Sequence, residues 1–240
     1  MSLMFVDFAA SVAKDSDAEH LNEDSYLFSI NGKVASLSDG ASESFDSKSW
    51  AAILCGMSCT GLGISPASIY QAVKAYSTIH DPSKLSWSKA LAFERGSFAT
   101  LLSCEYNNVR SEVEIFAVGD SVVVICEGEE VTKCFPLTTP EQFEMRPELL
   151  STRNDHNDFI NDPLFNAKHV MVSAVSSNTT VLLMTDAIGH WCYKSISEGR
   201  EEWRLLLSID SELEFAEFIK KSRKNKTMKL DDTTLIRLRF

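Results

Sequence analysis

About ten short stretches of the chain either alternate between apolar and polar residues or run continuously apolar with many β-branched side chains, and each predicts a strand. These stretches are residues 4–12, 25–31, 33–38, 98–105, 111–118, 121–126, 130–135, 168–175, 180–185 and 233–239. Turn sequences separate several neighbouring pairs, at Asn31-Gly32, residues 106–109 and residues 127–130. Strands joined by such short turns pair antiparallel, so antiparallel sheets are expected.

Helical periodicity occurs in five further segments. They are residues 47–59, 66–77, 86–95, 199–209 and 211–222. Asp46 or Ser47 could cap the first helix, and Pro66 suits the first turn of the second. Because helices fall between blocks of strands, the order favours two stacked antiparallel sheets with helices outside. Residues 136–166 are the least regular and are expected to form a surface flap beside a site.

Length and charge narrow the class of protein. The 240 residues are expected to form one domain over 1–240, with residues 1–3 a leader left from cloning. The 34 acidic and 23 basic residues give a net charge of -11, which repels phosphate backbones, so no nucleic-acid partner is expected. No stretch approaches the roughly 18 apolar residues of a membrane span, so no membrane partner is expected either.

The cysteines indicate the compartment. None of the six forms a C-x-x-C pair, and most lie in apolar runs. This usage favours reduced thiols and a cytoplasmic location over a set of disulfides. We expect the chain to be a monomer.

Acidic residues stand at the ends of several predicted strands. They are Glu23, Asp24, Asp39, Asp120, Asp186, Asp231 and Asp232. Taken singly, each has a simpler explanation as a turn, a solvated loop or a surface pair. Strand ends can gather distant side chains, however, and gathered carboxylates repel unless a cation neutralises them. Asp186 follows an apolar strand, where a carboxylate needs a partner. Ligands with oxygen donors alone suit magnesium and manganese.

The order of these motifs resembles that of the metal-dependent protein phosphatases, the PPM or type 2C family, and a bacterial subgroup in particular. The matching residues are Asn22-Glu23-Asp24, Asp39-Gly40, Val118-Gly119-Asp120-Ser121, Thr185-Asp186 and Asp231-Asp232-Thr233-Thr234. The resemblance covers the chain from about residue 5 to 240. It implies an α+β fold, a four-layer α-β-β-α sandwich of two antiparallel sheets flanked by helices, with a dinuclear metal site at one end of the sheets.

The resemblance also implies an activity. A serine/threonine protein phosphatase of this kind uses two Mn²⁺ or Mg²⁺ ions and a metal-activated bridging water to hydrolyse phosphomonoesters on a phosphorylated protein or peptide. Asp39 would bridge both ions, and the Gly40 carbonyl would bind one of them. Asp186 and Asp231 would bind the other ion, and Asp120 could bind a third.

The catalytic residues implied by the resemblance are Asp24, which would hold water at the metals, and Glu23, which would support it. Many family members carry an arginine before this motif that binds the substrate phosphate, and this chain has none there. Lys14 or His20 could bind the phosphate instead, without the bidentate geometry of arginine, and His20 could also contact the leaving group. His190 replaces an acid linked in some members to a third metal.

These departures leave alternatives open. A catalytically weak phosphatase-like module that binds a phosphoprotein would keep the same motifs, and a hydrolase of small phosphate esters would share the site. The basic run at residues 220–229 is typical of the solvated end of a helix, with a docking patch for acidic partners as the alternative.

Overall fold

The computed structural model describes residues 3–60 and 63–240, so the expected leader lies outside the described residues except for Leu3. The strands are β1 (Phe5–Val12), β2 (Ser25–Phe28), β3 (Val34–Ser38), β4 (Phe98–Ala99), β5 (Leu101–Asn107), β6 (Glu112–Val118), β7 (Val122–Glu127), β8 (Glu130–Phe135), β9 (Leu150–Ser151), β10 (Val170–Ala174), β11 (Thr179–Met184) and β12 (Thr233–Arg239). The α-helices are α1 (Ser47–Ser58), α2 (Pro66–Ile79), α3 (Trp87–Arg95), α4 (Phe165–His169), α5 (Asp186–Ser197) and α6 (Glu212–Lys224).

Two five-stranded antiparallel sheets form the centre of the molecule. One has the strand order β1-β12-β11-β7-β8, and the other has the order β10-β6-β5-β3-β2. We call them the C-terminal sheet and the N-terminal sheet, after β12 and β2. The short strands β4 and β9 pair separately. The α+β fold predicted from the sequence is therefore confirmed.

The position of strand β11 explains why its sequence does not alternate between apolar and polar residues. All its side chains are buried. Val181 and Leu183 pack between the two sheets, whereas Leu182 and Met184 pack under the outer helices of the C-terminal sheet. A strand covered on both faces needs apolar side chains at every position.

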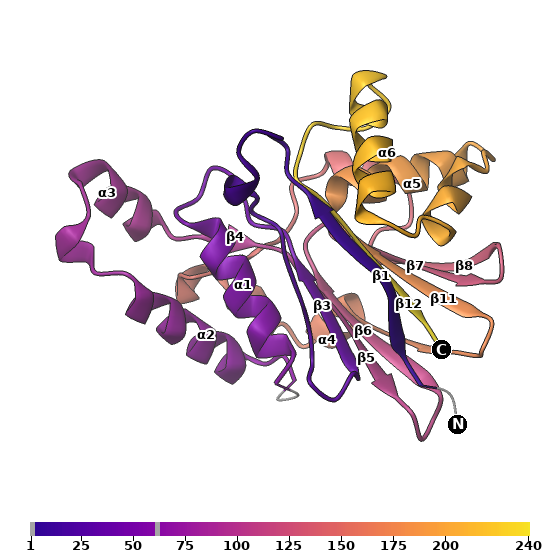
Figure 1. Ribbon diagram of the computed structural model, residues 1–240. Helices are drawn as coiled ribbons and strands as arrows, with labels where there is room; N and C mark the ends of the chain where they lie inside the picture. The colour runs from indigo at the N-terminus through magenta and orange to yellow at the C-terminus, as the bar shows by residue number, and fades with distance from the viewer. Residues whose placement is uncertain (1–2, 61–62) are drawn as a thin grey trace.

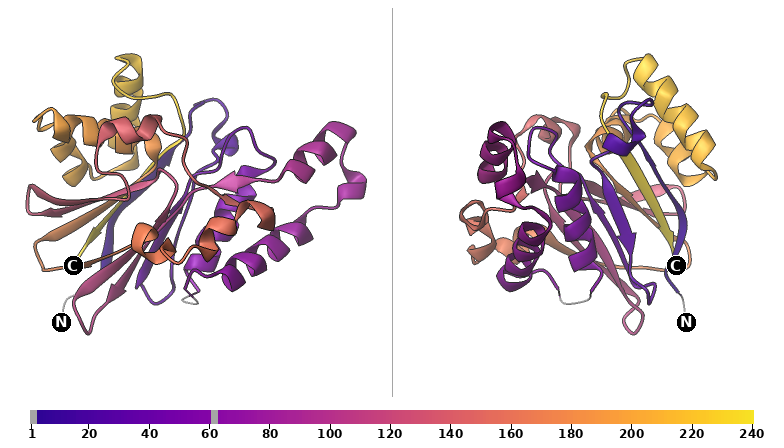
Figure 2. Two further views of the ribbon diagram at one scale, coloured as in Figure 1. Left: turned by 180° about the vertical axis from the view of Figure 1, so that it is seen from behind. Right: turned by 60° about the vertical axis from the view of Figure 1, so that its left-hand side comes forward.

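The helices complete four layers. Trp50 of α1 and Tyr76 of α2 pack on the outer face of the N-terminal sheet, and Trp191 of α5 and Phe215 of α6 pack on the outer face of the C-terminal sheet. Figure 1 shows the two helical layers on opposite sides of the strands, with α3 projecting away from the body, and the two views of Figure 2 agree. No helix of the described residues is long and apolar enough to cross a membrane.

The structure corrects several boundaries predicted from the sequence. The strand predicted over residues 98–105 is divided at Thr100 into β4 and β5, which belong to different sheets. Helix α5 was not among the predicted helices, although Asp186, His190, Lys194 and Ser197 form a polar stripe at helical spacing along it. The helix predicted over 199–209 is a 3-10 helix, η6 (Glu202–Leu207).

Candidate metal centre

Two aspartates lie side by side at one end of the N-terminal sheet. Asp24 comes immediately before β2, and Asp39 comes immediately after β3. Because Ser25 of β2 is the register partner of Ser38 of β3, the two aspartates lie next to each other at the same end of this strand pair. The predicted hairpin turn at Asn31-Gly32 fixes this register from the far end.

The C-terminal sheet brings further aspartates to the same end. Asp186 is the first residue of α5, directly beyond β11, and Asp231 precedes β12. The neighbouring ends of these strands pair through Met184 and Leu235. Asp120 lies where the chain passes from β6 in one sheet to β7 in the other. The layered fold thus collects carboxylates that are up to about two hundred residues apart in the sequence.

Asp39 lies at the centre of this group. Its backbone N–H donates to the Thr100 hydroxyl at 2.9 Å, and its carbonyl accepts from the Thr100 N–H at 2.9 Å. None of the hydrogen bonds among the described residues reaches its carboxylate. Burial raises the pKa of Asp39 well above its usual value, and the negative charges of four other aspartates raise it further: Asp24, Asp186, Asp120 and Asp231.

Gly40 is required for packing as well as for its expected role at a metal. A Cβ atom at this position would lie 2.9 Å from the Cβ, carbonyl carbon and carbonyl oxygen of Ser47, the first residue of α1. Gly40 also bridges to Ala99 of β4. The glycine therefore lets α1 approach the end of β3 closely, which holds Asp39 in place.

Asp24 is the most buried of these carboxylates and links the two sheets. Its Oδ2 atom accepts hydrogen bonds from the hydroxyls of Thr234 at 2.6 Å and Thr185 at 3.2 Å, both from the C-terminal sheet. Its Oδ1 atom is buried without a hydrogen-bond partner among the described residues. Burial and the neighbouring negative charges raise the pKa of Asp24 to about 8. Such a carboxylate has one oxygen fixed and one free for a ligand.

Asp186 and Asp231 are joined by a lysine that the sequence did not assign to the site. The Lys229 ammonium group lies 2.8 Å from Asp186 Oδ2 and 2.8 Å from Asp231 Oδ2. Burial opposes its charge, but hydrogen bonds to both carboxylates outweigh this effect and raise the pKa of Lys229. The other oxygen of Asp186, Oδ1, is buried without a partner among the described residues.

Glu23 and Lys14 pair with each other beside the aspartates. Lys14 Nζ lies 2.7 Å from Glu23 Oε2 and donates to Ser42 Oγ at 2.7 Å, and Glu23 Oε1 accepts from Ser47 Oγ at 2.6 Å. Burial would raise the pKa of Glu23, but the hydrogen bonds from Lys14 and the serines lower it. Asp232 accepts the backbone N–H groups of both Lys14 and Glu23. Lys14 therefore lies close to the site, and its ammonium group is ion-paired with Glu23.

The two histidines singled out in the sequence make no hydrogen bond or ion pair with the aspartates among the described residues, whereas Asp120 lies near those aspartates. His20 is exposed on a 3-10 helix, η1 (Glu19–Leu21), where its backbone carbonyl accepts a hydrogen bond from Lys48 and its side chain has no hydrogen bond among the described residues. His190 stacks on Phe143, in the segment expected to be a flap, with 5.2 Å between ring centres. Asp120 does join the group: burial, and then the negative charge of nearby Asp186, raise the pKa of Asp120 to about 6.

Arg223 holds the loop that carries Asp231. Its guanidinium donates to the carbonyls of Ala13 and Asp231 and to the hydroxyl of Thr233. Through these hydrogen bonds Arg223, which belongs to α6, holds the end of β1 beside the start of β12. The basic run at 220–229, expected to be a solvated helix end, thus includes two residues with specific roles at the site, Arg223 and Lys229. Their positions in a lysine-rich surface segment gave no signal in the sequence.

The donor atoms suit hard divalent cations. Among the described residues, no three histidine, cysteine, aspartate or glutamate side chains are already arranged around one point as a metal site. The reason is visible in the contacts, because Lys229 holds an oxygen of both Asp186 and Asp231 and threonine hydroxyls hold one of Asp24. The free oxygens of Asp24 and Asp186 and the unpaired carboxylate of Asp39 remain, and such oxygens are the ligands that Mg²⁺ and Mn²⁺ prefer.

Comparison with known proteins supports the architecture. No family model matches the sequence, and no curated protein sequence matches it. Among solved structures, the serine/threonine phosphatase Stp1 from Staphylococcus aureus superimposes with a TM-score of 0.62 at 12% identity, covering 100% of this chain and 97% of that one. The Mycobacterium tuberculosis serine/threonine phosphatase PstP/Ppp gives 0.60 at 16% identity, over 100% and 99%. The chain has the fold of these phosphatases.

A third structure is of interest for the metal centre. The catalytic domain of the phosphatase PstP, in complex with two manganese ions, superimposes with a TM-score of 0.56 at 15% identity, covering 99% of this chain and 98% of that one. The match confirms the sandwich of two sheets that the motifs predicted. The roles of individual residues in this chain stay predictions.

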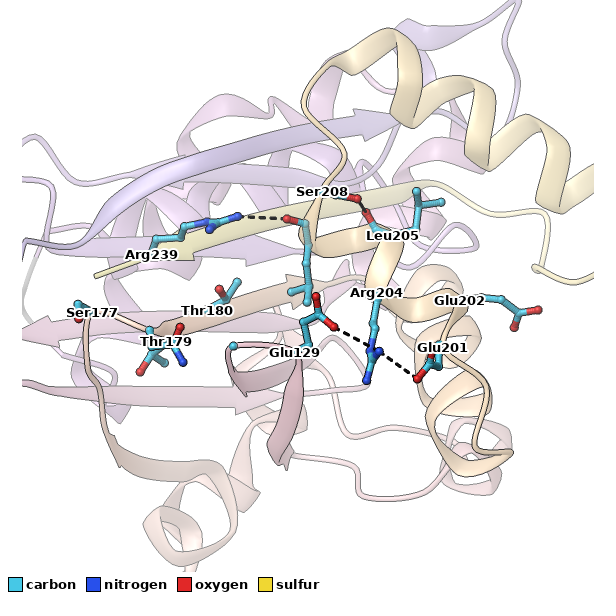
Figure 3. A pocket seen from close by; sticks show the side chains of 13 residues that line it. Glu129, Ser177, Thr179, Thr180, Glu201, Glu202, Arg204, Leu205, Ser208 and Arg239 are labelled. Atoms are coloured by element: carbon cyan, nitrogen blue, oxygen red, sulfur yellow. Dashed lines mark hydrogen bonds and ion pairs between the residues drawn. The ribbon is translucent and has the colours of Figure 1, made fainter.

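One hollow of the described surface lies far from the aspartates. It measures about 650 Å³ and is lined by the β7–β8 turn, the start of β11, η6 and Arg239 near the end of β12. The aspartates stand at the opposite ends of β11 and β12. Figure 3 shows that Arg204 in this hollow is paired with Glu129 and Glu201, at 3.2 and 3.0 Å. The charge of Arg204 is paired within the protein, although its Nε atom has no hydrogen-bond partner among the described residues. None of the clustered aspartates lines this hollow, so we do not place the site there.

Without metal, the protein should become less stable as the pH rises from about 5 to about 8. Asp24 has its pKa raised to about 8 in the folded state, whereas an unfolded aspartate titrates near 3.9. Between these values the folded state binds more protons, so raising the pH favours the unfolded state. Urea unfolding with a chelator at both pH values measures the effect. Asp24→Asn should weaken the pH dependence, and an unchanged dependence would contradict this assignment.

Proposed function

We propose that the chain is a metal-dependent serine/threonine phosphoprotein phosphatase that uses two Mn²⁺ or Mg²⁺ ions. One observation carries the proposal: aspartates from the ends of both sheets converge at one end of the sandwich, with buried carboxylate oxygens that lack partners. Convergence of this kind is costly for the fold unless a cation neutralises it. The solved phosphatases with the same fold support the reaction class.

The residues divide into those that would hold the ions and those that orient the site. Asp39, the Gly40 carbonyl, Asp186 and Asp231 would hold the two ions, with Asp120 available to a third. When bound, such ions lower the pKa of water and neutralise charge on the phosphoryl oxygens. The protein supplies no nucleophile of its own in this proposal.

Asp24 and Glu23 would orient the water and the substrate. Asp24 is fixed through Oδ2 by Thr234 and Thr185, which leaves Oδ1 to accept a hydrogen bond from water. Glu23 orders Lys14 and Ser47 around it. Lys14 is the closer candidate for a phosphate contact, because His20 makes no side-chain contact with the group.

A groove beside the aspartates supports a polypeptide substrate. It measures about 540 Å³, and its lining includes Ala41, two residues after Asp39. Phe98 and Phe159 give it apolar walls, and the charged side chains that line it are Glu43, Arg95, Arg146 and Glu148. A peptide segment flanking a phosphorylated serine or threonine could lie there, whereas a small ester would leave it empty.

We further propose that the protein acts as a single domain and a monomer in the cytoplasm, without nucleic-acid or membrane partners.

Hydrolysis of p-nitrophenyl phosphate and of a phosphothreonine peptide tests the proposal. Both reactions should require Mn²⁺ or Mg²⁺ and should stop on chelation, and the peptide should give the higher kcat/KM because it can use the groove. If the protein binds manganese and the phosphopeptide but hydrolyses neither compound, the chain is a binding module of the phosphatase fold instead. If turnover persists in excess chelator, the metal-dependent mechanism is wrong.

A further inference from the structure

Lys229 occupies the space between two carboxylates expected to bind one of the metal ions. Its ammonium nitrogen is 2.8 Å from an oxygen of Asp186 and 2.8 Å from an oxygen of Asp231. The other expected ligand, Asp39, has no such competitor, because no hydrogen bond among the described residues reaches its carboxylate. The two expected metal positions therefore differ, because a lysine is bonded to carboxylates of only one of them. The sequence motifs do not reveal this difference.

A metal ion that binds these two Oδ2 atoms competes with the lysine for them. Mg²⁺ binds carboxylate oxygens at about 2.0–2.1 Å and demands near-ideal geometry, so an ion held by the Oδ2 atoms of Asp186 and Asp231 would come into close contact with the ammonium group. Two cations so close would repel strongly. Full occupation of this position through both Oδ2 atoms requires the ion pairs of Lys229 to break, whereas Oδ1 of Asp186 is free in either case.

Lys229 is also able to leave. Its side chain is 58% exposed, against 15% for Asp186 and 27% for Asp231. It lies between α6 and β12, in a loop whose Asp231 end is held separately by Arg223. The lysine can swing into solvent while the carboxylates stay in place, so the exchange of ammonium for metal needs no change in the fold.

We propose that Lys229 is an internal competitor for the metal position formed by Asp186 and Asp231, which makes this position the weaker of the two. The inference rests on the proposed function. The first ion binds at Asp39 and the Gly40 carbonyl, and the second binds only when the metal concentration is high enough to displace the lysine. Lys229 thereby sets the metal concentration at which the dinuclear centre forms.

Calorimetric titration of the chelator-treated protein with manganese alone tests this inference. The parent should bind two ions with clearly different affinities. In Lys229→Gln the weaker Kd should fall about tenfold, an effect of the size expected for losing two exposed ion pairs, while the tighter Kd changes little. Electron paramagnetic resonance should show the coupled two-manganese signal at correspondingly lower manganese concentration.

Two variants control for charge. Lys224→Gln removes the same charge from an exposed lysine that makes no ion pair or hydrogen bond among the described residues, and it should leave both affinities unchanged. Lys229→Arg keeps a cation and should retain a weak second position. Equal manganese affinities in Lys229→Gln and the parent, with two ions bound in each, would overturn the inference and leave the proposed function standing. Absence of manganese binding in every variant would overturn both.

Discussion

Asp39→Asn should reduce turnover of p-nitrophenyl phosphate by at least about 10²–10³-fold while leaving the protein folded. The expected role of Asp39 is to bridge two cations, and a neutral amide cannot supply the charge that holds both. Loss of metal-dependent charge stabilisation costs several kcal/mol of activation free energy, and about 1.4 kcal/mol corresponds to a tenfold change in rate. The fold should tolerate the change, because the backbone of Asp39, and not its carboxylate, is bonded to Thr100.

Asp46→Asn is the matched control for this substitution. Asp46 lies seven residues further along and caps α1 by accepting the backbone N–H of Ser49 at 3.4 Å, which confirms one of the two caps predicted from the sequence. Its φ angle of 41° is left-handed, a conformation that asparagine tolerates as well as aspartate. Asp46 also pairs with His80, whose Nε2 atom lies 3.0 Å from Asp46 Oδ2. Activity within about twofold of the parent is expected, and a loss equal to that of Asp39→Asn would mean that the site is misplaced.

The sequence predicted the positions of the aspartates because their strands have strong local signals. The Asn31-Gly32 turn sets the register of β2 and β3, and that register alone places Asp24 beside Asp39. The apolar run of β11 predicted a doubly covered strand, so a carboxylate at its end had to have a partner. In each case the side-chain period predicts where the strand ends, and the carboxylate at that end requires a partner there.

The residues that the sequence did not reveal act through tertiary contacts alone. Lys229 and Arg223 belong to a run of basic residues, and nothing local separates them from exposed neighbours such as Lys224. Only the packing of α6 beside β1 and β12 turns one of them toward carboxylates and the other toward backbone carbonyls.

The contacts of Lys229 also affect the stability of the fold in the absence of metal. One ammonium group between two carboxylates offsets part of their repulsion, but its charge is half that of a divalent ion and it does not reach Asp39. The raised pKa values of Asp39 and Asp24 record the repulsion and desolvation that remain. A protein in this state should gain stability from any cation that can enter the group.

Manganese should therefore raise the melting temperature of the protein by about 5–11 °C at roughly 100 times its Kd. A ligand bound only by the native state contributes about 2.7 kcal/mol at that concentration, and a chain of this length shifts by about 2–4 °C per kcal/mol. Differential scanning fluorimetry with chelator and with manganese measures the shift. Magnesium should give a shift in the same direction.

Asp39→Asn should show a much smaller manganese shift than the parent, because the ions lose their common ligand. Its metal-free form should melt at least as high as the metal-free parent, since one repelling charge has gone from the group around Asp24 and Asp186. Stabilisation of the metal-free variant together with loss of metal binding distinguishes a ligand from a residue that merely supports the fold, whose removal would lower both melting temperatures. An equal manganese shift in parent and variant would rule out Asp39 as the bridging ligand.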